Sequence, residues 1–205
     1  MAIHRIAYAA TKRFSTLVLD HVADDSFLSS FREHAPTWDG LEAAAGSRQF
    51  DPAHRAVLVS AIRRQYAGID PGDAVSSSIE KLARPDALTI TTGHQLCVFL
   101  GPLYVPFKLL NTIRRAREAA VPFMVPQVPL LSVASEDHDR AEIDHAWFGD
   151  RRLHWPGATG GPVGRMPLAG FDQVVGEACA ALGQGTDSAR LQALLREYYR
   201  PGRTL

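Results

Sequence analysis

The stretch Leu88-Thr-Ile-Thr-Thr-Gly-His-Gln95 decides the fold. Its β-branched residues predict a buried strand that ends at Gly93, where a sharp turn carries the histidine and the glutamine. Gly101-Pro-Leu-Tyr104 follows, and its glycine and proline predict the beginning of a helix. A buried strand that passes through a turn into a helix is typical of α/β proteins, whose ligands bind at this joint.

The next segments extend this joint into a strand–helix–strand unit. Apolar residues recur at helical spacing from Leu103 and predict a helix to about Ala120. A second apolar run from Met124 is broken by prolines, so its usable strand is predicted at Leu130 to Ala134. The size matches a right-handed βαβ crossover with parallel strands. We therefore predict an α/β fold whose parallel sheet is incomplete, since two strands cannot bury the apolar residues of their helices.

The flanking segments divide the chain into two predicted domains. Residues 1–85 form a helical lead-in, which begins with an extended arm or edge strand at residues 1–23, and residues 86–205 form the first part of the core domain. Within the core domain, the patterns after the second strand predict a helix at residues 142–147, a strand pair at residues 151–155 and 163–166, and helices at residues 171–182 and 188–199.

Composition narrows the class of protein. Hydrophobic residues make up 46% and charged residues 21%, which is typical of a soluble globular chain. Lys plus Arg and Asp plus Glu both number 22, so the chain lacks the basic footprint of proteins that bind nucleic acid or anionic membranes. No signal pattern or membrane-length apolar run is found, which predicts a cytoplasmic protein. Cys97 and Cys179 match no zinc or disulfide spacing and are predicted to be buried free thiols.

The first joint offers groups that suit an anion. Lys108 lies about two turns into the predicted helix, with Asn111 on the same side. A phosphate or carboxylate could be held by the unpaired N–H groups of the helix start, with His94 supplying a proton or a hydrogen bond. The alternative is a tight turn whose histidine caps backbone groups, with Lys108 solvated. On Thr92-Gly-His-Gln95 alone, this structural alternative is favoured.

An acidic cluster, Ser135-Glu-Asp-His-Asp139, follows the second strand directly. Its ionisable side chains cannot be buried without partners, because each unpaired charge costs several kcal/mol. They could stabilise a following helix start through its dipole, bind substrate, or contribute to a metal site if other ligands come from elsewhere. Their position at the carboxyl end of a buried strand, beside the first joint, favours a binding site.

Taken together, the motifs resemble those of the BshC family, the cysteine-adding enzymes of bacillithiol biosynthesis. The resemblance implies a Rossmann-like core related to class I nucleotidyltransferases, with the turn at His94 in the place of their nucleotide-binding loop. The motifs that carry the resemblance are Thr92-Gly-His-Gln95, Gly101-Pro-Leu-Tyr104, Lys108, Ser135-Glu-Asp-His-Asp139, Glu142, His145 and Pro162-Val-Gly-Arg165.

The resemblance also implies an activity. Members of the family are cysteine ligases that join the cysteine carboxylate to the amine of glucosaminyl-malate, and activation of a carboxylate most economically uses a nucleotide, ATP or ADP. They are longer than this chain, with a coiled coil that supports a homodimer. No metal, nucleic acid or membrane partner is expected. Two alternatives stay open: a metal-dependent hydrolase built on Asp137, His138 and Asp139, and an inactive truncated remnant.

The residues expected to form the site fall into two groups. The expected catalytic residues are His94, Glu136, Asp137, His138 and Asp139. The residues expected to contact substrate or nucleotide are Thr92, Gly93, Gln95, Gly101, Tyr104, Lys108 and Asn111.

Overall fold

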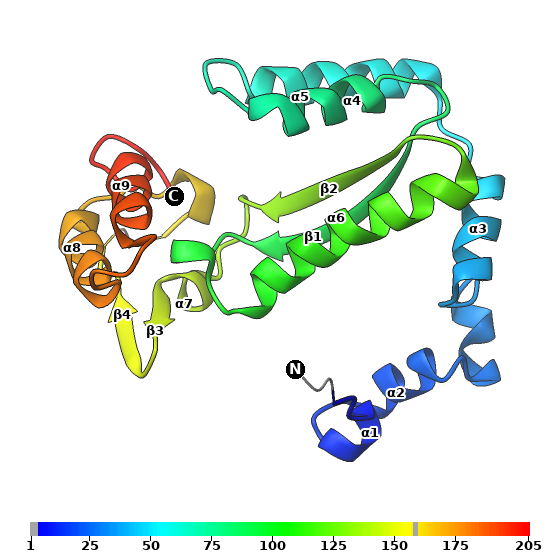
Figure 1. Cartoon of the computed structure of the whole chain (residues 1–205), viewed down its shortest axis with the longest axis horizontal. Helices are drawn as coiled ribbons and strands as arrows, with labels where there is room; N and C mark the ends of the chain where they lie inside the picture. The colour runs from blue at the N-terminus through cyan, green and yellow to red at the C-terminus, as the bar shows by residue number, and fades with distance from the viewer. Residues whose placement is uncertain (1–3, 158–159) are drawn as a thin grey trace. The chain divides into compact units, whose positions relative to one another are not determined.

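The computed structural model describes residues 4–157 and 160–205, and Figure 1 gives the order of their helices and strands. The chain divides into two compact units, of which one comprises Met1–Leu88 with Ala120–Pro126 and the other Thr89–Ala119 with Gln127–Leu205. The elements of the N-terminal segment are α1 (Tyr8–Thr11), α2 (Thr16–Val22), the 3-10 helix η1 (Ser26–Phe31), α3 (Trp38–Ser47), α4 (Pro52–Gln65) and α5 (Gly72–Leu82).

Within the arm at residues 1–23, which is predicted to be extended or an edge strand, residues 8–11 and 16–22 are instead helical, and residues 1–3 lie outside the described part of the chain. Ser15 is the N-cap of α2, and its hydroxyl oxygen accepts a hydrogen bond from the amide of Val18 at 3.4 Å. This cap satisfies one of the amide groups that a helix start leaves unpaired. The prediction of an extended arm was wrong because Ser15 begins a helix that includes the apolar run Leu17-Val-Leu19.

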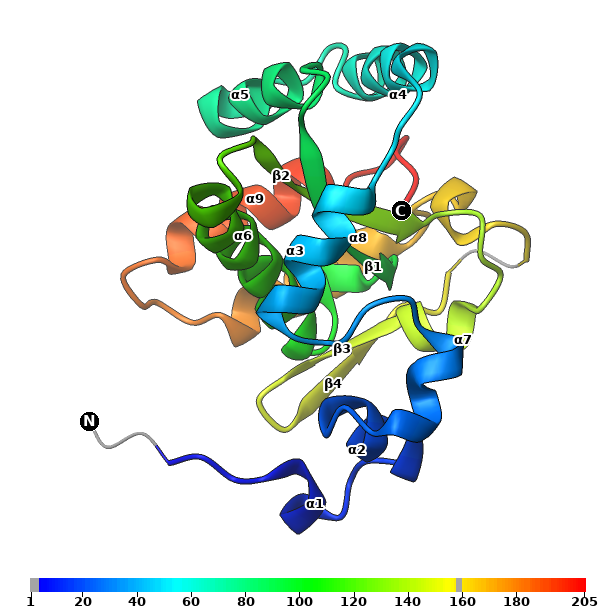
Figure 2. The same cartoon turned by 90° about the vertical axis from the view of Figure 1, so that its right-hand side faces the viewer.

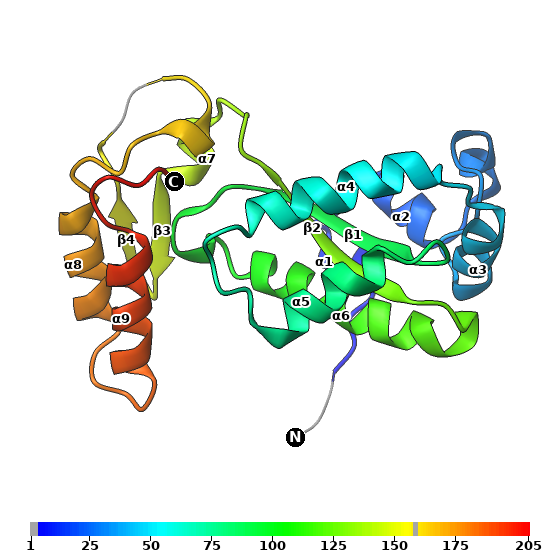
Figure 3. The ribbon, with the colours of Figure 1, turned by 90° about the horizontal axis from the view of Figure 1, so that it is seen from above.

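A buried arginine ties α4 to the chain that follows α5. The two helices lie side by side (Figure 3). Arg55 is only 8% exposed, and its guanidinium donates to the carbonyl oxygens of Leu82 at 3.1 Å and Ala87 at 3.0 Å. The carbonyl of Leu82 lies at the end of α5, and that of Ala87 directly precedes β1 (Leu88–Gln95). The arginine therefore fixes the point at which the first strand begins.

The second unit contains the predicted strand–helix–strand. β1 (Leu88–Gln95) and β2 (Gln127–Ala134) are neighbours in a two-stranded sheet. Both strands run in the same direction, and α6 (Tyr104–Phe123) lies alongside them (Figure 1). The α/β, Rossmann-like class with an incomplete sheet is thereby confirmed. Because the two strands are parallel, the carboxyl ends of β1 and β2 lie at the same edge of the sheet.

The element boundaries differ from the predictions in three places. β1 continues through Gly93 to Gln95, so the turn comes later, at the 3-10 helix η2 (Val98–Leu100). α6 begins at Tyr104 and not at Gly101. β2 begins at Gln127 and includes Pro129, because a strand in a two-stranded sheet has one unpaired edge where the missing N–H of proline costs no ladder bond.

The segment after β2 forms a hairpin that the sequence patterns did not predict. After α7 (Arg140–Ile143), β3 (His145–Phe148) pairs with β4 (Arg151–His154) in antiparallel fashion (Figure 2). The predicted helix at residues 142–147 and the predicted pairing of residues 151–155 with 163–166 are therefore wrong. The hairpin forms because its strands place apolar side chains on one buried face. Ala146 and Leu153, which lie opposite each other across the two strands, are both buried.

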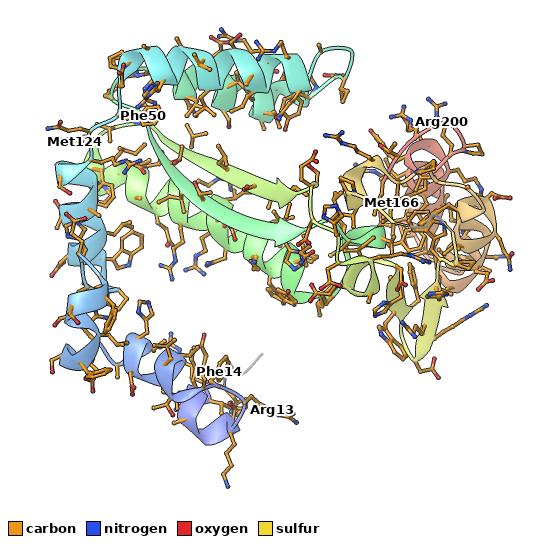
Figure 4. The ribbon with its side chains drawn as sticks, turned by 180° about the vertical axis from the view of Figure 1, so that it is seen from behind. Arg13, Phe14, Phe50, Met124, Met166 and Arg200 are labelled. Carbon is orange, nitrogen blue, oxygen red and sulfur yellow. The ribbon has the colours of Figure 1, made fainter. Side chains whose placement is uncertain are left out.

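Aromatic residues form the core of the C-terminal part. The predicted last two helices are confirmed as α8 (Phe171–Ala181) and α9 (Ser188–Tyr198). Phe171 stacks on Tyr199 with ring centroids 4.9 Å apart, and Trp155 meets Phe171 edge-on at 5.2 Å. Met166, which follows the 3-10 helix η3 (Val163–Arg165), is 2% exposed and lies among these helices (Figure 4). In the described part of the chain, no helix is long and apolar enough to cross a bilayer.

Candidate functional site

The turn between β1 and α6 follows an unusual backbone path. Phe99, Leu100 and Gly101 have positive φ angles of 52°, 69° and 58°. A Cβ atom on Gly101 would lie 2.6 Å from the Cβ and 2.8 Å from the Sγ of Cys97. Only glycine combines this conformation with so close an approach, so Gly101 sets the tight return of the chain towards the helix.

His94 is held by hydrogen bonds on both ring nitrogens. Its Nδ1 lies 2.8 Å from the carbonyl oxygen of Gln95, and its Nε2 lies 2.7 Å from the hydroxyl of Tyr104. A carbonyl oxygen can only accept, so Nδ1 carries a proton and donates it. In the neutral ring Nε2 is then the acceptor for the Tyr104 hydroxyl, which is the tautomer required of a group that takes up a proton at Nε2.

Lys108 completes the group of side chains at the joint. Its ammonium donates to the carbonyl oxygen of Gly93 at 2.5 Å and lies 5.7 Å from the centre of the Tyr104 ring. The carbonyl of Gly93 thus keeps the positive charge of Lys108 beside the end of β1. Asn111, predicted to share this side, is exposed and makes no side-chain hydrogen bond within the described chain.

The beginning of α6 has unpaired donors. Val105 donates to the carbonyl of Pro102 at 2.9 Å, whereas the amides of Leu103 and Tyr104 donate to no other backbone carbonyl of the described residues. Such donors, with the positive end of the helix dipole, attract an anion. Together with the ammonium of Lys108 they suit an anionic group such as a phosphate or a carboxylate.

The acidic residues after β2 fall into distinct environments. Asp137 folds back onto its own loop, where its Oδ1 accepts from the amides of His138 at 2.6 Å and Asp139 at 3.3 Å. Asp139 stands at the N-cap of α7 but makes no capping hydrogen bond, and His138 is exposed. The side chains of His138 and Asp139 are therefore available to a ligand, while that of Asp137 shapes the loop.

The segment around η3 fastens this acidic loop. Val163 donates to the carbonyl of Asp137 and Gly164 to the carbonyl of Ser135, each at 2.8 Å. A Cβ on Gly164 would lie 2.7 Å from the Cβ of Ser135, so the glycine is needed for this approach. We call residues 162–165 the strap.

Cys97 lies beside His94 at the first joint. The Sγ of Cys97 lies 3.5 Å from Nδ1 of His94. Burial raises the pKa of the Cys97 thiol, and the negative charge of Glu142 raises it further. Within the described chain no hydrogen bond or ion pair joins His94 or Lys108 directly to the acidic loop.

Several predictions about single residues are changed by the structure. Both cysteines are free, but only Cys179 is buried, whereas Cys97 is half-buried and packs against the site. Thr92 is half-buried and makes no side-chain hydrogen bond among the described residues, and the side-chain oxygen of Gln95 is buried without a partner. The strap residue Arg165 belongs to the family motif Pro162-Val-Gly-Arg165, and its contact with Glu136 has no local signal in the sequence.

The arrangement gives no support to the metal-dependent hydrolase. In residues 4–157 and 160–205, no three His, Cys, Asp or Glu side chains are placed to hold a metal ion together. Asp137 uses its carboxylate on its own backbone, and so does not converge with His138 and Asp139. Asp144 is not part of the acidic loop, and its carboxylate contacts two other histidines, at 3.1 Å from Nδ1 of His145 and 3.2 Å from Nε2 of His154.

Two parallel strands joined through a helix, with polar groups where each strand ends, are typical of a Rossmann-like domain. The chain matches over residues 1–205 the model of the N-terminal Rossmann-like domain of the bacillithiol biosynthesis protein BshC. It belongs to the BshC family, and the predicted family resemblance is confirmed.

Curated relatives agree with this assignment. The proteins from Flavobacterium johnsoniae and Cytophaga hutchinsonii are each 34% identical to the chain, over 95% and 85% of its length. The protein from Salinibacter ruber is 31% identical over all of it. Each carries the name "Putative cysteine ligase BshC". The chain spans 37%, 34% and 39% of the length of these relatives, respectively.

Proposed function

We propose that the gene product carrying this chain is a ligase that joins L-cysteine to glucosaminyl-malate through an amide bond. The observation that supports this most is the joint at the end of β1, where Lys108 donates to the carbonyl of Gly93 and Tyr104 contacts both Lys108 and His94, beside unpaired helix amides. This combination suits a substrate that carries an anion and exchanges a proton. The names of the relatives supply cysteine ligation as the reaction.

The joint is proposed to bind the carboxylate to be activated and the phosphates of ATP. ATP, when bound, would supply the phosphoryl or adenylyl group that turns one carboxylate oxygen of cysteine into a leaving group, with release of ADP or pyrophosphate, so that attack by the amine would expel phosphate or AMP. Lys108 and the amides of Leu103 and Tyr104 would hold negative charge. His94 would keep one proton on Nδ1, fixed by the carbonyl of Gln95, and exchange the other at Nε2 through the hydroxyl of Tyr104.

The acidic loop is proposed to receive the amine. An amine attacks an acyl carbon only as the free base, so a neighbouring group must take up its proton. Asp139 and His138 have side chains free for this role, and Glu136, held by Arg165, would attract the ammonium form as it arrives. Asp137 would keep the loop in shape through its own amides.

Mass spectrometry tests the proposal. The gene product is incubated with glucosaminyl-malate, L-cysteine and ATP, and the expected product has the mass of the two substrates less one water. Omission of ATP and replacement of cysteine by its methyl ester should each abolish the product. Full formation of the product without ATP, or none with every component, would refute the proposed reaction.

Substitutions at the joint link the reaction to the geometry. His94→Asn should lower kcat by about a hundredfold or more, the range expected for loss of a proton-transfer group. The matched control is His21→Asn, because His21 is an exposed histidine in α2. If both variants keep the activity of the natural sequence, His94 has no part in the reaction.

A further inference from the structure

The strap presents an arginine to the acidic loop on a rigid backbone. Val163, within the strap, and Met166, directly after it, are 0% and 2% exposed. Both backbone hydrogen bonds of the strap to the loop are 2.8 Å long. The position of the Arg165 backbone is therefore fixed, although its side chain is 73% exposed.

Arg165 uses only one of its nitrogens. Its Nη2 donates to both carboxylate oxygens of Glu136, at 3.1 Å and 3.2 Å. Its Nη1 and Nε make no hydrogen bond with any other described residue. Glu136 is itself 66% exposed, and an ion pair in such an environment contributes little to folding stability. The pair thus holds the guanidinium in place and leaves its other donors open to solvent.

We propose that Arg165 binds a carboxylate of the amine substrate. A guanidinium offers a planar pair of donors that matches the two oxygens of a carboxylate, and anchoring by Glu136 lowers the entropy lost when a ligand binds. The acidic loop beside it attracts an ammonium. The guanidinium of Arg165 beside the carboxylates of the acidic loop suits a molecule that carries both an amine and carboxylates. The identity of that molecule as glucosaminyl-malate rests on the proposed function.

The competing interpretation is that Arg165 only positions the acidic loop. In that case its loss would change the binding of every amine, whether or not the ligand carries a carboxylate. Glucosaminyl-malate and its dimethyl ester separate the two interpretations, because they share one skeleton and one amine and differ only in the charged oxygens that Arg165 would contact.

Calorimetric titration of the gene product with each compound tests the inference. The natural sequence should bind the acid more tightly than the ester. Arg165→Ala should weaken binding of the acid by about tenfold or more, to the level of the ester, and leave the ester unchanged. Arg165→Lys should fall in between, because it keeps the charge and loses the paired donors. The matched control is Arg151→Ala, which removes another exposed arginine that pairs with a glutamate, Glu177, at 3.0 Å.

The outcomes are distinct. The inference is overturned if Arg165→Ala weakens acid and ester equally, if it changes the affinity of the acid by less than about twofold, or if the natural sequence binds the acid no better than the ester. Binding is measured without cysteine or ATP. A protein that binds the acid through Arg165 but forms no amide in the mass assay would refute the proposed reaction and leave this inference standing.

Discussion

Replacement of Gly101 by alanine should destabilise the unit that contains the joint. The new Cβ would meet the Cβ of Cys97 at 2.6 Å and its Sγ at 2.8 Å, and overpacking of this kind costs about 1–3 kcal/mol. The backbone angles, φ 58° and ψ −148°, are nearly restricted to glycine and add about 1–3 kcal/mol. The free energy of unfolding should therefore fall by about 2–6 kcal/mol.

A second substitution separates the two costs. Cys97→Gly removes the atoms that the new methyl group would meet, so in the double variant only the backbone cost of Gly101→Ala should remain. The expected coupling energy between the two positions is about 1–3 kcal/mol in a double-mutant cycle. Gly170→Ala is the control for a glycine of positive φ without steric conflict, because Gly170 has φ 70° and ψ 9° and open space where its Cβ would be, and this left-handed conformation costs alanine less than that of Gly101.

Urea unfolding followed by tryptophan fluorescence measures these changes, since Trp155 is fully buried in the same unit. Gly101→Ala should lower the midpoint further than Gly170→Ala does. The steric argument would be refuted if the two variants were equally stable, or if Cys97→Gly recovered none of the loss.

Three further predictions concern the strap, the aromatic core and the cysteine. Gly164→Ala should lower stability by about 1–3 kcal/mol in urea unfolding, since its methyl group would lie 2.7 Å from the Cβ of Ser135; a neutral result would contradict the close approach. Tyr199→Phe removes the hydroxyl that accepts from the amide of Phe99 at 2.9 Å and should cost about 1 kcal/mol; an unchanged midpoint would show that the amide finds another partner. Because burial raises the pKa of the Cys97 thiol, its thiolate forms at higher pH in the folded chain than in the unfolded one. The rate of alkylation by iodoacetamide, followed by mass spectrometry, should therefore reach half its maximum at a higher pH in native protein than in urea. Equal midpoints in the two states would argue against the burial of the thiol.

The first half of the core could be predicted because its signals are local. The β-branched run from Leu88 and the apolar spacing from Leu103 each report the periodicity of a single element. The hairpin was missed because four-residue strands are too short for a clear period. Its best signal was Gly149-Asp150 between the strands, where Gly149 has φ 65° and a two-residue turn needs a residue of that kind.

The contacts of the site were beyond prediction for a different reason. That Lys108 reaches the carbonyl of Gly93 depends on the path of η2, where successive residues have positive φ, and non-glycine residues such as Phe99 give no sign of this in the sequence. The contact between Arg165 and Glu136 joins segments on either side of the hairpin, so it follows from tertiary packing and from no local pattern.

Backbone atoms fix both halves of the candidate site, the joint at the end of β1 and the acidic loop with its strap. The groups that stabilise the fold are therefore largely different from the side chains expected to bind or react. The carbonyls of Gly93 and Gln95 hold Lys108 and His94, and the loop carbonyls of Ser135 and Asp137 accept the amides of the strap. The side chains that face solvent, such as those of His138, Asp139 and Arg165, thus contribute little to the packing that positions them. Their substitution should change binding or rate while the fold persists, whereas the glycines that permit the close backbone approaches, Gly101 and Gly164, should be intolerant of any side chain even though they carry no reactive group.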